Sequence, residues 1–221
     1  MQKKLIITGL IFVCFFVIWT LALTRLDVQP IGPNNTSVAM ATFNRAFHNF
    51  TGVHFIVYMV TDWLGLVPIF ACLIFAILGL VQCIKRKHIK KVDPDILMLG
   101  LYYIVVISIY LVFENVVINY RPVLINGYLE ASYPSSTTLL VLCVMPTVQL
   151  QVRRRMHSQW LRRMVNFIIG VYTLFMLVAR TVSGVHWLSD IIGGVLISTG
   201  LVILYCGIWN IRWHNTQNQT K

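Results

Sequence analysis

Arg180-Thr-Val-Ser-Gly-Val-His186-Trp-Leu-Ser-Asp190 is the stretch that joins the last two apolar runs of the chain. Arg180 ends one run, and Asp190 begins the next. If the second run is helical, His186 and Asp190 lie four residues apart on one face. A carboxylate beside an imidazole fixes its tautomer and stabilises its cationic form, while a guanidinium fits phosphate oxygens. The stretch therefore predicts a polar site where lipid meets water.

The composition around this stretch is that of a membrane protein. Hydrophobic residues make up 57% of the chain and charged residues only 11%, unlike a soluble domain. The 221 residues are enough for one bundle of about six spans of about 20 residues each. We expect one all-α polytopic domain over residues 1–221. The five cysteines show no metal-binding spacing, and we expect no cofactor and no metal.

Six apolar runs are candidate membrane spans. The first opens like a signal peptide, but it is longer than the about 7–15 apolar residues of such peptides, so a retained helix is favoured. The second is interrupted by Asp62 and Pro68. Before it, aromatic residues spaced at i, i+4 and i+7 over 43–50 predict a short amphipathic helix at the interface. The six runs cover approximately residues 5–23, 53–84, 96–117, 134–150, 164–179 and 188–209.

The distribution of lysine and arginine predicts the orientation. With a cytoplasmic N-terminus, the basic clusters at 85–91 and 153–163 face the cytoplasm, as do both termini. We interpret the net charge of +11 as a topology signal beside anionic headgroups, and not as a sign of nucleic-acid binding. The remaining cytoplasmic cations are Lys3, Lys4, Arg212 and Lys221. The outer side holds Arg25, Arg45, Arg121 and Arg180.

The same topology gathers three separated segments on the outer side. These are Tyr120-Arg121-Pro122, the segment 134–137 (Pro-Ser-Ser-Thr) and the stretch 180–190. Charged residues near lipid are functional candidates, although the arginines could also snorkel to headgroups and pair with Asp190. The segment 134–137 suits a helix N-terminus, whose free N–H groups bind anions. Together the segments predict a phosphoryl-transfer site that needs no metal.

These residues resemble the type 2 phosphatidic acid phosphatase superfamily, membrane lipid phosphatases that share a core with vanadium haloperoxidases. The third family motif, Arg-x5-His-x3-Asp, is intact as Arg180, His186 and Asp190. The first motif, Lys-x6-Arg-Pro, keeps Arg121-Pro122 but has Glu114 in place of its lysine. The second, Pro-Ser-Gly-His, reads Pro134-Ser135-Ser136-Thr137.

The resemblance implies a role for each matching residue. His186 would be the nucleophile that forms a phosphohistidine, and Asp190 would orient it. Arg121 and Arg180 would bind the phosphate oxygens, and Ser135 with the backbone at Ser136 would complete the cradle. Two roles lack their usual residue. Thr137 stands where the family has a general acid histidine, and Glu114 should repel the substrate unless it is protonated or paired with an arginine.

The missing acid bears on the substrate, because losing a general acid costs about 10²–10⁴-fold in rate. A lipid alcohol leaves as an alkoxide whose conjugate acid has a pKa of about 16, whereas a lipid monophosphate has a second pKa of about 6. We therefore expect hydrolysis of a lipid phosphate or pyrophosphate, of the polyprenyl pyrophosphate or phosphatidate class, at the extracytoplasmic face. The missing acid biases this expectation towards diphosphates or towards phosphoryl transfer between lipids.

Two alternatives stay open at this point. A desolvated Glu114 could remain protonated and act as a surrogate acid, with Thr137 the other residue at the acid position. The chain could instead be a degenerate relative that binds lipid headgroups or takes part in a membrane assembly. In each case the expected partners are the bilayer and a lipid phosphate, and the sequence does not specify an oligomeric state.

Overall fold

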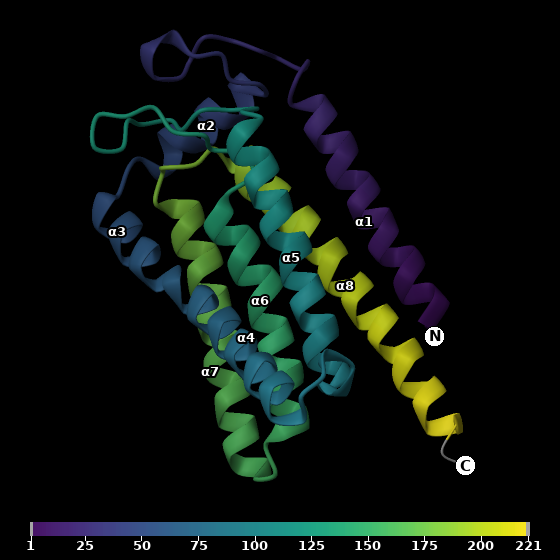
Figure 1. Ribbon diagram of the computed structural model, residues 1–221. Coiled ribbons are helices and arrows are strands. Elements are labelled where there is room, and N and C mark those ends of the chain that lie inside the picture. The colour runs from purple at the N-terminus through teal and green to yellow at the C-terminus, as the bar shows by residue number, and fades with distance from the viewer. Residues whose placement is uncertain (1, 220–221) are drawn as a thin grey trace.

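The fold is a bundle of α-helices, shown in Figure 1 as a computed structural model that describes residues 2–219, with side chains to residue 209. Helix α6 lies at the centre and is in contact with α4, α5, α7 and α8. The helices in this described part are α1 (Gln2–Ala22), α2 (Ala41–Thr51), α3 (Phe55–Leu64), α4 (Leu66–Arg86), α5 (Pro94–Asn115), α6 (Ser136–Arg155), α7 (Gln159–Val182) and α8 (Leu188–Gln219), with short 3₁₀ turns at Pro33–Asn35 and Ile89–Lys91.

The outside of the bundle is apolar and its interior is partly polar. Large apolar side chains such as Ile18, Ile74 and Phe167 are exposed, whereas Arg180 and Asp190 are buried. This reversal of the soluble pattern suits a protein surrounded by lipid. Five segments are long and apolar enough to cross a bilayer, namely α1, α3 with α4, α5, α7, and α8 as far as Trp209. They confirm five of the six predicted runs.

The remaining predicted run, 134–150, forms the central helix α6, which is less apolar than the others. Its residues Thr138, Thr147 and Gln151 are buried against neighbouring helices, and its last turn is basic. A helix enclosed by other helices does not need an apolar surface, because it meets no lipid. Apolar composition alone therefore does not identify α6 as a span, although its 20 residues match a span in length.

The break in the second apolar run lies at Gly65, and not at the two residues that the sequence suggested. Asp62 lies within α3, and Pro68 lies in the first turn of α4. Proline is tolerated in a first turn because its missing N–H would have no partner there. Helix α3, which lies before the break, contacts α7, the helix that carries Arg180.

Helix α1 packs along α8 at one side of the bundle (Figure 1). A Cβ atom at Gly200 would lie 3.1 Å from the carbonyl oxygen of Gly9, so the two backbones approach closely at these glycines. Near the other end of α1, the indole N–H of Trp19 donates to the carbonyl of Ser189 at 3.1 Å. The contact fixes the first turn of α8 against α1.

The predicted amphipathic helix is confirmed as α2, while its position at the membrane interface stays a prediction. Its buried face carries Asn44, whose side-chain amide donates to the Ser189 hydroxyl at 2.9 Å and accepts from the Ser189 N–H at 3.1 Å. Phe50 on the opposite face is exposed. Helix α2 therefore caps the start of α8 and holds it in place.

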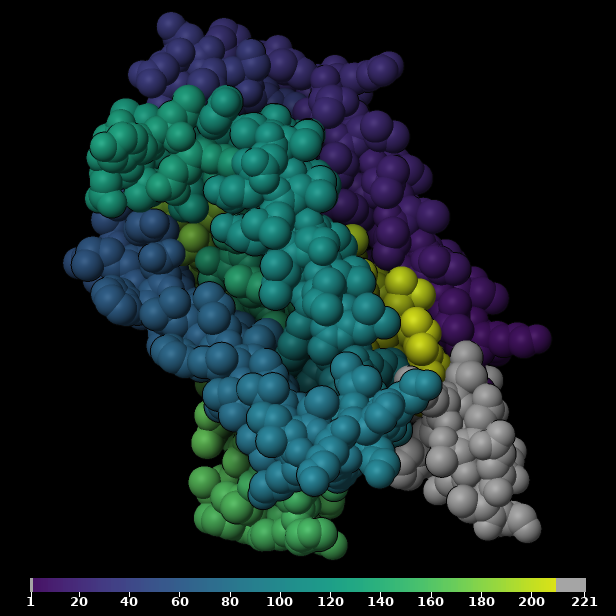
Figure 2. All heavy atoms as spheres, viewed as in Figure 1, coloured from purple at the N-terminus to yellow at the C-terminus, as the bar shows by residue number. Residues whose placement is uncertain are grey.

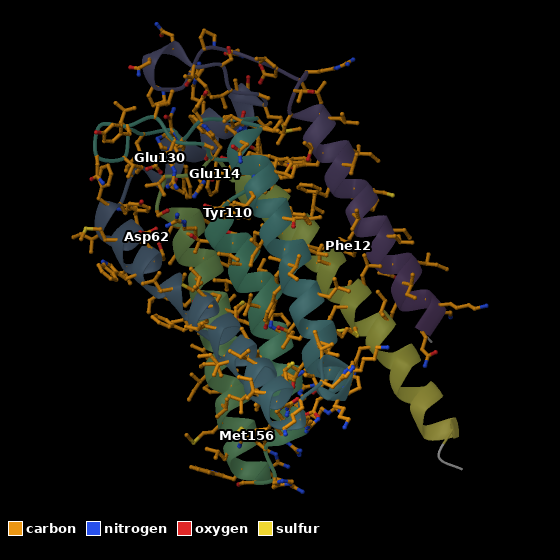
Figure 3. All side chains as sticks on the ribbon, viewed as in Figure 1. Phe12, Asp62, Tyr110, Glu114, Glu130 and Met156 are labelled. Atoms are coloured by element: carbon orange, nitrogen blue, oxygen red, sulfur yellow. The ribbon has the colours of Figure 1, made fainter. Side chains whose placement is uncertain are left out.

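The ends of the bundle differ in charge. One end carries the basic cluster 153–163, which begins in the last turn of α6, and there Arg155 and Arg154 pair with the buried Asp95 at 2.7 and 3.3 Å. Met156, next to that cluster, lies at the opposite end from Glu114 and Glu130 (Figure 3). Of the predicted cytoplasmic cations, Arg212 and Lys221 fall outside the residues whose side chains are described.

Candidate active site

The three predicted segments meet at the end of the bundle away from the basic cluster. The connection from α5 to α6 forms a hairpin in which the N–H of Arg121 donates to the Glu130 carbonyl at 3.1 Å and that of Ser132 donates to Asn119 at 2.9 Å. Its tip is Asn126-Gly127, and both residues have positive φ. Asn-Gly favours a two-residue hairpin turn of this kind. The hairpin lies between the 24–54 segment and α3 (Figure 2).

His186 lies in the short link between α7 and α8 and is buried. Its Nδ1 is 2.9 Å from the hydroxyl of Ser132, and its Nε2 is 3.3 Å from Nη2 of Arg180. A guanidinium only donates, so Nε2 must be the acceptor and carry a lone pair. The proton of the neutral ring is therefore on Nδ1, and the lone pair that accepts from Arg180 is on Nε2.

Asp190 supports this arrangement without touching the imidazole. Its Oδ2 accepts from the Ser132 hydroxyl at 2.6 Å and from the Trp187 N–H at 3.0 Å, while Oδ1 accepts from Asn119 at 3.1 Å. Since the single hydroxyl proton of Ser132 goes to Asp190, its oxygen accepts from Nδ1–H of His186. A chain from Asp190 through Ser132 thus replaces the direct contact expected from the sequence. The reason is that α8 begins only at Leu188, so His186 and Asp190 do not share a helix face.

Arg180 is the most deeply buried cation at this end of the bundle, with only 1% of its surface exposed. Its Nη1 donates to the Thr61 hydroxyl at 3.2 Å and lies 3.9 Å from Asp62. The guanidinium lies over the ring of Tyr58, 5.0 Å from its centroid. Helix α3 therefore contacts Nη1 of the guanidinium, while Nη2 faces His186. The buried Nε of Arg180 has no hydrogen-bond partner among the described residues.

Arg121 approaches the same place from the hairpin and is also buried. Its Nε lies 3.1 Å from a carboxylate oxygen of Glu130, and its Nη1 is buried without a partner among the described residues. Arg121, Glu130, Ser132 and His186 line one cavity of about 210 Å³. Buried donors that lack acceptors are costly, so this cavity suits an anion with several oxygens.

The segment 134–137 begins α6 as predicted, but only part of it reaches the cavity. Pro134 and Ser136 line it, whereas the Ser135 hydroxyl accepts from Thr138 at 3.1 Å. The Ser135 N–H donates to the carbonyl of Asp190 at 3.2 Å, which joins α6 to α8. Thr137 packs towards Gly65 and is not part of the lining.

Glu114 lines the cavity but forms no ion pair with the described arginines. The arginine partner that the sequence allowed for Glu114 is instead taken by Glu130. Two further histidines at this end of the bundle, His48 and His54, do not line the cavity. Glu114 is exposed and lies near the end of α5, so it lines the cavity from this helix.

The charges around His186 affect its protonation. Burial, together with the positive charges of Arg121 and Arg180, holds the pKa of His186 well below its ordinary value of 6.5. The imidazole is therefore neutral at pH 7, with its Nε2 lone pair unprotonated. A neutral imidazole is the form that can act as a nucleophile.

The sequence pattern of the PAP2 superfamily matches residues 69–215 of this chain. The matched region includes the hairpin, the start of α6 and the stretch 180–190. The chain belongs to the PAP2 superfamily. This confirms the resemblance drawn from the third motif. No curated protein sequence matches this PAP2 chain.

The PAP2 fold is also found in a solved structure, described as the first transmembrane PAP2 type phosphatidylglycerolphosphate phosphatase from Bacillus subtilis. The two share 20% sequence identity with a TM-score of 0.61, and the match covers 92% of this chain and 96% of the other. The architecture is thus that of a multi-pass membrane protein, with all-α topology.

The structure adds polar residues that the motifs did not single out. Ser132 and Asn119 bind Asp190, and Thr61 and Tyr58 hold Arg180. The Asn126-Gly127 turn was a usable signal, because it implies that residues on either side of it pair across a hairpin. Thr61 and Tyr58 had no comparable signal, since they lie in an apolar run far from the motifs.

Proposed function

We propose that this PAP2 protein hydrolyses a lipid phosphate or pyrophosphate through a phosphohistidine at His186. One observation carries the proposal: the unprotonated Nε2 of His186 accepts a hydrogen bond from Arg180, and His186 lines a cavity that also holds Arg121. A nucleophile between two cations matches what transfer of an anionic phosphoryl group requires. The phosphatase with the similar fold supports a lipid substrate.

The proposed reaction has two steps. Arg180 shifts its hydrogen bond from Nε2 to a phosphoryl oxygen, and Nε2 attacks phosphorus. The bond to the leaving oxygen breaks, the lipid product departs with that electron pair, and the ring becomes a phosphorylated imidazolium with its proton still on Nδ1. Asp190 stabilises that positive charge through Ser132. Water then attacks phosphorus, Nε2 recovers its electron pair, and inorganic phosphate leaves. The two guanidinium groups stabilise the charge that develops on the phosphoryl oxygens, so the proposal invokes no metal.

The substrate is proposed to enter from the outer leaflet. This follows from the placement of the cavity at the end of the bundle opposite the basic cluster, together with the rule that basic clusters face the cytoplasm. Three residues that line the cavity, Tyr110, Phe113 and Glu114, belong to α5, which also exposes the apolar residues Leu111 and Val112. A lipid headgroup could then reach His186 while its chains stay in the membrane.

The test is phosphate release by the purified protein in detergent from a polyprenyl pyrophosphate and from phosphatidate. We expect a higher kcat with the pyrophosphate, because Thr137 does not line the cavity and a phosphate leaving group barely needs protonation. Equal or faster turnover of phosphatidate would contradict this preference. No release from either lipid would favour a protein that only binds headgroups.

The depressed pKa of His186 gives a second test. In an NMR titration of protein labelled with ¹⁵N-histidine, the imidazole of His186 should have its protonation midpoint well below pH 6.5. Arg121→Gln should raise that midpoint, because it removes a positive charge that disfavours the imidazolium. Arg25→Gln removes an exposed charge away from the cavity and should leave it unchanged. A His186 midpoint at or above 6.5 would contradict the assignment of a neutral nucleophile.

A further inference from the structure

We propose that Tyr58 is a positioning residue, whose ring holds the guanidinium groups of Arg121 and Arg180 together at the phosphoryl site. The inference rests on the proposed function and adds to it a residue from outside the three motifs. Tyr58 lies in α3, which precedes the region 69–215 that matches the PAP2 pattern. Its side chain does not line the cavity, so it acts through the arginines and not on the substrate.

The ring of Tyr58 lies close to both cations. The Cζ atom of Arg180 is 5.0 Å from the ring centroid, and that of Arg121 is 5.8 Å from it. Both distances fall within the about 6 Å at which the face of an aromatic ring attracts a cation. The two arginines come from separate segments, the hairpin and the last turn of α7. Tyr58 is therefore a contact that the two segments share.

Two neighbouring cations repel each other, and the ring offsets part of that repulsion. Like charges repel more strongly where water is scarce. The carboxylate near Arg180, that of Asp62, lies 3.9 Å away with its side chain 59% exposed, so it offsets little. The negative face of a ring attracts both guanidinium groups without taking a hydrogen bond that phosphate needs. Nη1 of Arg121, which has no partner among the described residues, therefore stays available for the substrate.

Helix α3 is fixed at both ends, which also fixes the position of the ring. At its start, the His54 N–H donates to the carbonyl of Ser183, the residue that caps α7, at 2.9 Å. At its end, the Tyr172 hydroxyl of α7 donates to the carbonyl of Leu64 at 2.8 Å. Tyr58 lies between these two contacts. The helix can therefore hold the ring in one place while the substrate binds and leaves.

The experiment weakens the face of the ring while it keeps the shape of the side chain. Phenylalanine and its difluoro and trifluoro analogues are incorporated at position 58 of the full chain, and release of phosphate from a polyprenyl pyrophosphate is measured in detergent. Because fluorine withdraws electrons from the ring face, we expect kcat to fall stepwise, by about tenfold along the series, the effect of one desolvated contact between a cation and a ring. Tyr58→Phe itself should stay within about twofold of the wild type, since it keeps the ring.

Tyr58→Leu removes the ring and should lower kcat by about tenfold or more. The protonation midpoint of His186 in the NMR titration should rise towards 6.5 in this variant, because the two cations that disfavour its imidazolium are held less closely. Trp63→Leu is the matched control, since it removes an exposed ring from the same helix. It should change neither kcat nor the midpoint.

The outcomes separate the role of Tyr58 from the reaction. Equal kcat along the fluorinated series, or a loss in Tyr58→Phe as large as in Tyr58→Leu, would overturn the role of the ring and leave the proposed function standing. An unchanged His186 midpoint in Tyr58→Leu would overturn it too, because the arginines would not have moved. If Tyr58→Leu does not fold, the fluorinated series decides. If the wild type releases phosphate from neither lipid, the proposed function falls, and the role of Tyr58 with it.

Discussion

Replacing His186 by alanine is expected to lower phosphate release by about 10⁴-fold or more, because the group that attacks phosphorus is then absent. The wild type should also form a phosphorylated protein during turnover of a lipid labelled in its phosphate. That species should be acid-labile, as expected for a bond between phosphorus and nitrogen. It should be missing from His186→Ala in rapid-quench measurements.

The fold should survive this change, which makes the comparison meaningful. Asp190 keeps its hydrogen bonds from Ser132, Asn119 and the Trp187 N–H when the imidazole is removed. His54→Ala is the matched control, since His54 is an exposed histidine at the same end of the bundle but outside the cavity. Unchanged release by His186→Ala would show that another group attacks phosphorus, or that the assay detects a contaminant.

Arg180→Met is expected to separate activity from stability. It removes the donor to Nε2 of His186 and a cation beside the phosphoryl site, so kcat should fall by about 10²–10³-fold. Methionine has a similar length and no charge to bury, and the acidic partner that is lost, Asp62, is exposed, so the change leaves no buried carboxylate unpaired. The melting temperature in detergent should therefore stay level or rise.

Arg25→Met provides the control for this variant, because Arg25 is an exposed arginine outside the cavity. It should change neither kcat nor the melting temperature. If Arg180→Met instead unfolded the protein while Arg25→Met did not, the bonds from Arg180 to α3 would be needed for stability. Full activity in folded Arg180→Met would remove Arg180 from the proposed reaction.

The long apolar runs were predictable because lipid imposes one requirement on every residue of a span. The predicted starts of the first and last runs, for example, lie within a few residues of α1 and α8. The break at Gly65 was less predictable, because Asp62 and Pro68 are stronger signals than a glycine when the neighbouring helices are unknown. Proline in fact fits the first turn of α4.

The candidate site was predictable only where residue spacing carries the chemistry. Arg180, His186 and Asp190 follow from one short motif, and the structure brings Arg121 to the same cavity wall as His186. Ser132 was not predictable in the same way. A serine in a loop has no distinctive pattern, and its position between Asp190 and His186 depends on a hairpin register that forms only in three dimensions.

The Asn126-Gly127 turn sets the relative position of two residues in the proposed reaction. The two arms of the hairpin carry Arg121 on one side and Ser132 on the other. The proposed binding of phosphate by Arg121 and the hydrogen bond from Ser132 to His186 therefore both depend on this turn. A slip of one residue between the arms would break the pairing of Arg121 with Glu130 and of Ser132 with Asn119, so the two side chains would no longer face one cavity together. Disruption of this small turn would therefore have the kinetic effect of losing two separate residues.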